Sequence, residues 1–153
     1  MTLKAGDKAP DFTLPDETGA ERTLSSYLAT GPVVLFFYPA ANTAGCTAEA
    51  CHFRDLATEF EAAGAQRLGI SVDDVDKQND FSTKHGFDYP LLADVGGAVA
   101  TSYGVKRGAL MRRLTPVKRA TFVIGADGVI SDVITSETRM DRHADEALKA
   151  LAR

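Results

Sequence analysis

The sequence predicts an α/β fold organised around a strand, a helix and a second strand between residues 32 and 72. Residues 32–38 are apolar, β-branched or aromatic and are bounded by glycine and proline, which is typical of a short buried strand. The spacing of the next apolar residues predicts a helix from about 45 to 63, ended by Gly64. Those residues are Phe53, Leu56, Ala57 and Phe60. Residues 67–72 predict the second strand, parallel to the first and reached by a right-handed crossover.

The residues before this unit predict an extended lead-in. Residues 9–15 alternate apolar and polar side chains, and residues 16–19 are typical of a turn. Residues 23–28 predict a short capped helical turn.

The residues after the unit predict further surface and core elements. In order, these are a polar surface helix over 74–84, a short buried extended segment over 90–93, one or two helical turns over 97–103, and a hairpin of 119–124 and 129–135. A C-terminal helix from about 141 to 152 places an apolar stripe on one face, made of Ala144, Ala147, Leu148 and Leu151.

Length, charge and cysteine count limit the class of protein. At 153 residues the chain suits a single domain, residues 1–153, with a substantial core. The net charge of −4 argues against general affinity for nucleic acid or anionic membranes. No N-terminal apolar stretch resembles a signal peptide, and two cysteines are too few for a secreted disulfide scaffold. We therefore expect a cytoplasmic thiol protein.

Cys46 lies where the first strand has ended and the helix begins. Thr43 is a good N-cap residue, which would make Cys46 the third residue of the helix. The first helical turn has unpaired N–H groups and the positive end of the helix dipole, so it favours an anion such as a thiolate. The alternative is a small buried cysteine that packs as an apolar residue.

The residues around Cys46 resemble a known active-site signature. The pattern Pro39-x-x-x-Thr43-x-x-Cys46 is similar to that of the peroxiredoxins, and Cys46-x4-Cys51 followed by Phe53-Arg54-Asp55 resembles their bacterioferritin comigratory protein, or PrxQ, subgroup. The resemblance extends over nearly the whole chain, from residues 6–12 to residues 119–124. One departure is Ala44, where this subgroup commonly has proline; we expect a slightly looser turn there.

The resemblance implies a thioredoxin-like fold of the peroxiredoxin type, with a central mixed sheet flanked by helices. It also implies a thiol-dependent peroxidase for hydrogen peroxide and organic hydroperoxides. Cys46 would become a sulfenic acid, and Cys51 would condense with it to an intramolecular disulfide that a thioredoxin- or glutaredoxin-like protein reduces. No cofactor or metal is required, and we expect a monomer or a weak homodimer. The alternatives are a redox sensor and a thiol–disulfide oxidoreductase, neither with peroxidase turnover.

The same resemblance implies roles for four residues around the thiol. Arg119 would supply a fixed cation; the alternative is an exposed arginine at a strand end. Thr43 Oγ would hydrogen-bond the peroxide or the thiolate together with the Cys46 N–H. Pro39 would shield the sulfur from water or simply end the strand. Glu49, one turn after Cys46, either orients an arginine or is a solvated helix residue.

Two further groups of residues raise functional alternatives. Residues 95–126 contain no acidic residue, and their basic side chains form either a positive rim or a solvated loop: Lys106, Arg107, Arg112, Arg113, Lys118 and Arg119. The apolar Leu110, Met111 and Leu114 either bind a partner or hold this loop to the core. Cys46, Cys51 and the three histidines match no zinc spacing. His85 and His143 lie in unrelated, polar helical stretches.

Overall fold

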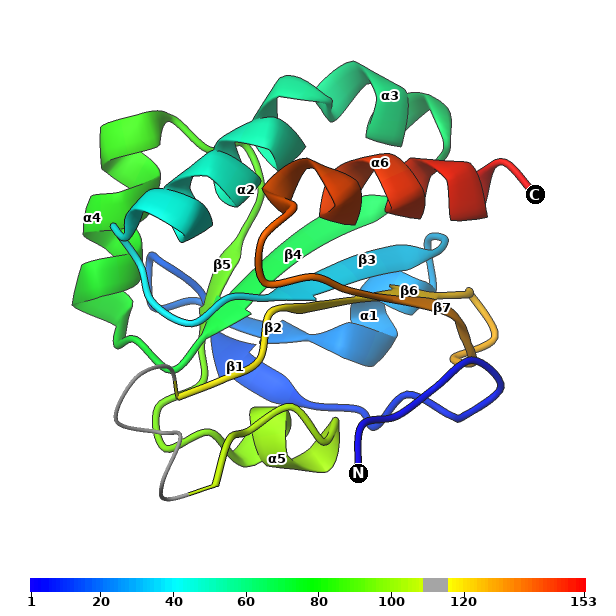
Figure 1. The fold of residues 1–153 in the computed structure, drawn as a ribbon, viewed down its shortest axis with the longest axis horizontal. Helices are drawn as coiled ribbons and strands as arrows, with labels where there is room; N and C mark the ends of the chain where they lie inside the picture. Colours follow the sequence, from blue (N-terminus) through cyan, green and yellow to red (C-terminus); the bar gives the residue numbers. More distant parts are fainter. Residues whose placement is uncertain (109–115) are drawn as a thin grey trace.

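A computed structural model describes residues 1–108 and 116–153. At its centre is a five-stranded mixed sheet in the order β5-β4-β3-β6-β7 (Figure 1). The strands are β3 (Val33–Phe37), β4 (Gln66–Ser71), β5 (Leu91–Ala93), β6 (Ala120–Ile124) and β7 (Ile130–Thr135). β3, β4 and β5 are parallel, whereas β6 is antiparallel to both β3 and β7. The predicted strand–helix–strand unit is confirmed, and its first strand is the middle strand of the sheet.

Helices cover both faces of the sheet, which explains why β3 is apolar along its whole length. On one face lie α2 (Ala44–Asp55), α3 (Ala57–Ala62), α4 (Val75–His85) and α6 (Met140–Leu151), and on the other lie α1 (Leu24–Leu28) and α5 (Ala98–Ser102) (Figure 1). Val34, Phe36 and Tyr38 join the core under α2, α4 and α6. The alternate residues Val33, Leu35 and Phe37 join the opposite core. A strand buried on both faces needs an apolar side chain at every position.

The single helix predicted from about 45 to 63 is wrong in one respect, because it is divided into α2 and α3. Leu56 separates them, with φ −97° and ψ 22°. The Phe53 carbonyl accepts a 2.8 Å hydrogen bond from Arg67 Nη1 at this point. In a continuous helix that carbonyl would accept from the N–H of residue 57. A guanidinium from β4 therefore takes the place of one helical hydrogen bond.

The predicted extended lead-in contains a small hairpin of its own. β1 (Thr13–Pro15) pairs antiparallel with β2 (Glu21–Thr23). Asp16 holds the turn between them, accepting from the N–H groups of Thr18 and Ala20 and from Arg22 Nε. Strands of three residues carry too short an alternation to be separated from a loop by sequence pattern.

The other predicted elements are present, with their ends displaced by at most one residue. Such displacements are within the ordinary uncertainty of helix and strand ends. The predicted cap of α1 is wrong, because the Thr23 hydroxyl pairs with the Thr13 hydroxyl and does not cap the helix. Within residues 1–108 and 116–153, none of the helices combines the length and the apolar character needed to cross a membrane.

Candidate active site at the start of α2

The segment between β3 and α2 is held by side chains from the connection after β4 and from α4. The Ala41 N–H donates to Asp73 Oδ2 at 2.7 Å, and Asn42 Nδ2 donates to Asp80 Oδ2 at 3.1 Å. Asn42 has φ 63°, a left-handed conformation that asparagine tolerates better than most residues. Pro39 is buried immediately after β3. These contacts fix the direction in which the chain enters α2.

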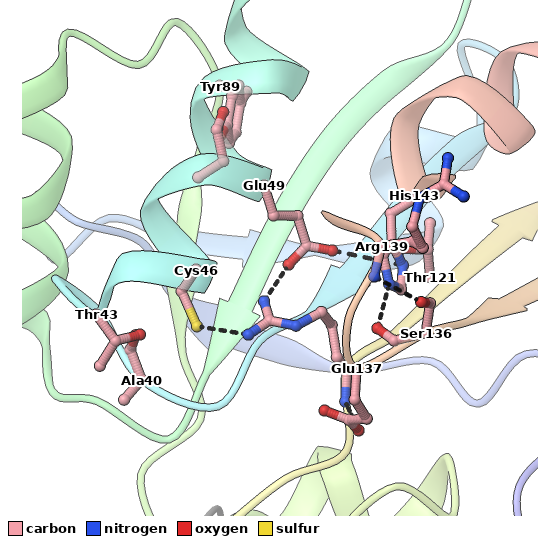
Figure 2. Close-up of polar contacts among 12 residues, drawn as sticks. Ala40, Thr43, Cys46, Glu49, Tyr89, Thr121, Ser136, Glu137, Arg139 and His143 are labelled. Carbon is pink, nitrogen blue, oxygen red and sulfur yellow. Dashed lines mark hydrogen bonds and ion pairs between the residues drawn. The ribbon is translucent and has the colours of Figure 1, made fainter. Parts of the chain in front are cut away.

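Cys46 is the third residue of α2, as predicted, with Thr43 at the N-cap position. Its side chain is only 1% exposed. The Thr43 side chain does not cap the helix: its Oγ1 donates to the Ala40 carbonyl at 2.8 Å (Figure 2). The Thr43 oxygen therefore keeps its lone pairs for another donor, on the exposed side of the loop beside Cys46.

Arg119 reaches Cys46 because β6 is the neighbour of β3. It lies one residue before β6, and Phe37 of β3 pairs with Ala120. The guanidinium is almost completely buried, with Nη2 at 3.3 Å from Cys46 Sγ. The alternative of an exposed arginine at a strand end is therefore wrong. A buried, permanent cation is therefore in direct contact with the sulfur.

Glu49 contacts the same guanidinium. Its side chain is completely buried, and Oε1 accepts from Arg119 Nη1 at 2.7 Å. The alternative of a solvated helix residue is therefore wrong. Burial raises the pKa of Glu49 from 4.5 to about 8, although the nearby Arg119 charge opposes this change.

His143 belongs to the same cluster, and sequence reasoning missed it. The predicted polar setting is wrong, because the side chain is completely buried on α6. Nδ1 lies 2.8 Å from Thr121 Oγ1 and 3.4 Å from Glu49 Oε2, while Nε2 lies 2.9 Å from the Ser136 carbonyl (Figure 2). The helical spacing of the sequence did contain a signal, because residue 143 shares a helix face with the apolar Ala147 and Ala150. In the structure all three are buried.

Comparisons with known proteins show which family the chain belongs to. A model of the AhpC/TSA family matches residues 5–133. The chain is 60% identical over 149 residues to a putative peroxiredoxin of Mycobacterium tuberculosis, covering 97% of this chain and 96% of that protein. It is 37% identical to the putative peroxiredoxin bcp of Coxiella burnetii, covering 99% and 100%. This chain belongs to the peroxiredoxins.

Solved peroxiredoxin structures have the same fold. Peroxidoxin BcpB from Mycobacterium tuberculosis superposes with a TM-score of 0.93 at 59% identity, covering 98% of this chain and 97% of that one. Peroxiredoxin Q from Xanthomonas campestris gives a TM-score of 0.84 at 32% identity, with coverage of 92% and 89%. The thioredoxin-like fold and the resemblance to the PrxQ subgroup are confirmed. The protein is a thiol-dependent peroxidase.

Cys51 lies on the same helix of this peroxiredoxin as Cys46. Both cysteines are free thiols, and Cys51 is partly exposed. Five helical residues separate their Cα atoms by about 8–9 Å, from the rise and turn of an α-helix. Disulfides need about 4.4–6.8 Å, so α2 in this form keeps the two sulfurs from bonding.

The basic stretch of the peroxiredoxin is described only in part. Arg107 Nη2 and the Arg119 N–H both donate to Glu137 Oε1, at 2.8 and 3.1 Å. Lys106 and Lys118 bond Gly96 O and Thr2 Oγ1. The predictions for Leu110, Met111, Arg112, Arg113 and Leu114 lie outside the described residues. Among the described residues, no three His, Cys, Asp or Glu side chains are grouped to hold a metal ion.

Proposed function

We propose that Cys46 is the residue with which this peroxiredoxin attacks hydrogen peroxide or an organic hydroperoxide. The observation that supports it is the 3.3 Å contact between Cys46 Sγ and the buried Arg119 guanidinium. The thiolate attacks one peroxide oxygen, the O–O bond breaks, and Cys46 becomes a sulfenic acid. The second oxygen leaves as hydroxide or alkoxide and takes up a proton to give water or an alcohol.

The neighbouring side chains each act on this step. Arg119 stabilises the thiolate and the negative charge that develops on the leaving oxygen. Thr43 Oγ1, whose own proton is donated to Ala40 O, accepts from the peroxide O–H. The Cys46 N–H, in the unpaired first turn of α2, donates to the peroxide or the thiolate. Pro39 keeps water from the sulfur, and Glu49 orients Arg119.

Cys51 then resolves the sulfenic acid. Its thiol attacks Cys46 Sγ, the S–O bond breaks, and water leaves as the intramolecular disulfide forms. A thioredoxin- or glutaredoxin-like dithiol reduces that disulfide and becomes oxidised itself. A reductant of this kind is kept reduced in the cytoplasm, so we infer a cytoplasmic enzyme. Its expected state is a monomer or a weak homodimer, which sedimentation of the reduced and oxidised protein would test.

Two serine variants test the assignment in a coupled peroxide-consumption assay with thioredoxin. Cys46→Ser should lose peroxide reduction, because a neutral hydroxyl is a far poorer nucleophile than a thiolate. Cys51→Ser should consume one equivalent of peroxide and then stall. Unchanged turnover in Cys46→Ser would overturn the nucleophile, and sustained turnover in Cys51→Ser would overturn the resolving residue. Many turnovers in the wild type also separate a peroxidase from a redox sensor.

A further inference from the structure

The hydrogen-bond partners of Glu49 and His143 indicate how many protons these two side chains carry together. Nε2 of His143 faces the Ser136 carbonyl at 2.9 Å. A carbonyl only accepts, so Nε2 carries a proton. In neutral histidine Nδ1 is then an acceptor, and it faces Thr121 Oγ1 at 2.8 Å and Glu49 Oε2 at 3.4 Å. Glu49 Oε2 has no hydrogen-bond partner in the described part of the chain.

An ionised Glu49 beside neutral His143 would bring two lone pairs together in a buried site. One added proton removes this conflict. It lies either on Glu49 Oε2, which then donates to Nδ1, or on Nδ1, which then donates to the carboxylate. In both placements the pair is electrically neutral and Glu49 Oε2 gains a partner. When Oε2 donates to Nδ1, the Thr121 hydroxyl must turn its proton away, because Nδ1 has a single lone pair. The 3.4 Å separation is long for such a bond and needs only a small side-chain adjustment to shorten.

We propose that His143 is a positioning residue of the peroxidase reaction: it shares one proton with Glu49, and this leaves the charge of Arg119 to the Cys46 sulfur. The inference rests on the proposed role of Cys46. It adds to that role a residue of α6 that contacts neither the sulfur nor the peroxide.

The charges at the site explain why the shared proton matters. With the proton on Glu49, thiolate and guanidinium are the two charges in contact, and they are opposite. When the pair loses its proton, Glu49 becomes a full anion 2.7 Å from Arg119 Nη1 and competes with the thiolate for one cation. The buried group then has a net negative charge, which a low-dielectric interior disfavours. Peroxide reduction should therefore slow as the pair deprotonates.

The surroundings of the pair favour the protonated form. Burial raises the pKa of Glu49 to about 8 and lowers the pKa of His143. At neutral pH this places the proton on Glu49 and leaves His143 neutral. The other charged or titratable groups around the pair come from α2, from the residues before β5, β6 and α6, and from α6 itself: Cys46, Tyr89, Arg119, Glu137 and Arg142.

The pH profile of Cys46 oxidation by hydrogen peroxide, measured in a single turnover, tests the proposal. In the wild type the rate should fall above about pH 8, as the pair loses its proton. In His143→Asn the amide cannot take up a proton, and its N–H groups stabilise ionised Glu49. The falling limb should disappear, and the rate at pH 7 should drop roughly tenfold, as expected for one weakened charge-assisted hydrogen bond.

His52→Asn is the matched control. His52 also joins α2 to α6, through a 2.8 Å contact with Asp145. It is partly exposed, and its side chain makes no hydrogen bond or ion pair with Cys46, Glu49, Arg119 or His143. Its pH profile should match that of the wild type. A profile of His143→Asn with the wild-type shape would overturn the proposal.

If His143→Asn does not fold, Thr121→Val replaces it. Nδ1 of His143 then has Glu49 as its one hydrogen-bond partner, and the fall in rate should move to higher pH. No shift, or a shift to lower pH, would contradict the shared proton.

Nuclear magnetic resonance of Cys46→Ser measures the proton without catalysis. The nitrogen signals of His143 should show a protonated Nε2, and the Glu49 carboxyl and His143 signals should titrate together above neutral pH. An unprotonated Nε2, or a pair that has already lost its proton at neutral pH, would overturn the inference. Because this measurement does not need peroxide reduction, its result is independent of the proposed role of Cys46.

Discussion

At the scale of single residues, Gly45 shows how closely Arg119 passes over the first turn of α2. A Cβ on Gly45 would lie 3.2 Å from Arg119 Nη2 and 3.6 Å from Met140 Sδ. The first of these distances is shorter than ordinary contact, so the guanidinium would have to move. Nη2 is also the atom that donates to Cys46 Sγ. The missing side chain of residue 45 therefore leaves room for the contact between Arg119 and Cys46.

Gly45→Ala should separate stability from activity. Alanine is the better helix former by about 1 kcal/mol, so the melting temperature should hold or rise. Peroxide reduction should fall roughly tenfold, because a displaced guanidinium weakens a charge-assisted hydrogen bond. Ala44→Gly, at an exposed position in the same turn, is the control and should show reduced stability with unchanged kcat/KM. Full activity in Gly45→Ala would show that Arg119 does not need this space.

At the scale of elements, α2 must open before Cys51 can reach Cys46. The half of the helix around Cys51 is held from several sides. Tyr89 Oη donates to the Ala50 carbonyl at 2.6 Å, and Phe53 stacks on Phe36 with ring centroids 4.1 Å apart. The first turn contains Gly45 and Thr47, which are weaker helix formers. We therefore expect the helix to unwind from its N-terminal end.

Hydrogen exchange of residues 44–54 in the two redox states tests this opening. The reduced protein should protect these amides and the disulfide form should expose them; equal protection would exclude Cys51 as the intramolecular resolving residue.

Tyr89→Phe should speed disulfide formation about fivefold, since it removes one hydrogen bond worth about 1 kcal/mol from the closed helix. Tyr103→Phe, whose hydroxyl donates to Pro10 O, is the control and should leave the rate unchanged.

At the scale of the whole molecule, the site is assembled by long-range packing. Arg119 and Cys46 are 73 residues apart and meet because β6 lies beside β3. His143 meets Glu49 because α6 packs on α2 over the same face of the sheet (Figure 1). The resulting cluster holds a cation, a carboxyl group and an imidazole in the interior. Their protonation is therefore coupled to folding.

The free energy of unfolding should fall as the pH rises from about 6.5 to about 8. Folded Glu49 keeps its proton up to a pKa of about 8, whereas unfolded Glu49 loses it near 4.5, so deprotonation favours the unfolded chain in between. The lowered pKa of His143 acts in the opposite direction, but only below about 6.5. Above that pH the Glu49 effect remains alone and amounts to at most about 2 kcal/mol.

Urea unfolding of two variants measures this effect without the thiol of Cys46. Cys46→Ser should lose stability across the interval, and Cys46→Ser with Glu49→Gln should lose less, because glutamine does not titrate. All other ionisable groups are common to the two variants, so they cancel in the difference. Parallel stability curves would show that Glu49 releases no proton between pH 6.5 and 8 in the folded protein.

The sequence by itself determined the features that depend on neighbouring residues. A run of apolar, β-branched side chains predicted the buried strand, and Thr43 predicted the helix start that makes Cys46 the third residue of α2. Arg119 was predicted only through the resemblance to a family, because no local pattern distinguishes it from an exposed arginine at a strand end. Local periodicity reports how a segment folds, but not which distant segment will lie against it.

Only the tertiary structure decided the surroundings of the thiol. The order of the strands placed Arg119 beside Cys46, and the packing of α6 on α2 buried Glu49 and His143 together. Arg67 of β4 donates a hydrogen bond to the Phe53 carbonyl, and the predicted helix is divided at Leu56. Each of these outcomes is a polar group from a distant part of the chain finding its partner in the interior. Burial makes such pairing obligatory, and the fold alone determines which groups are within reach.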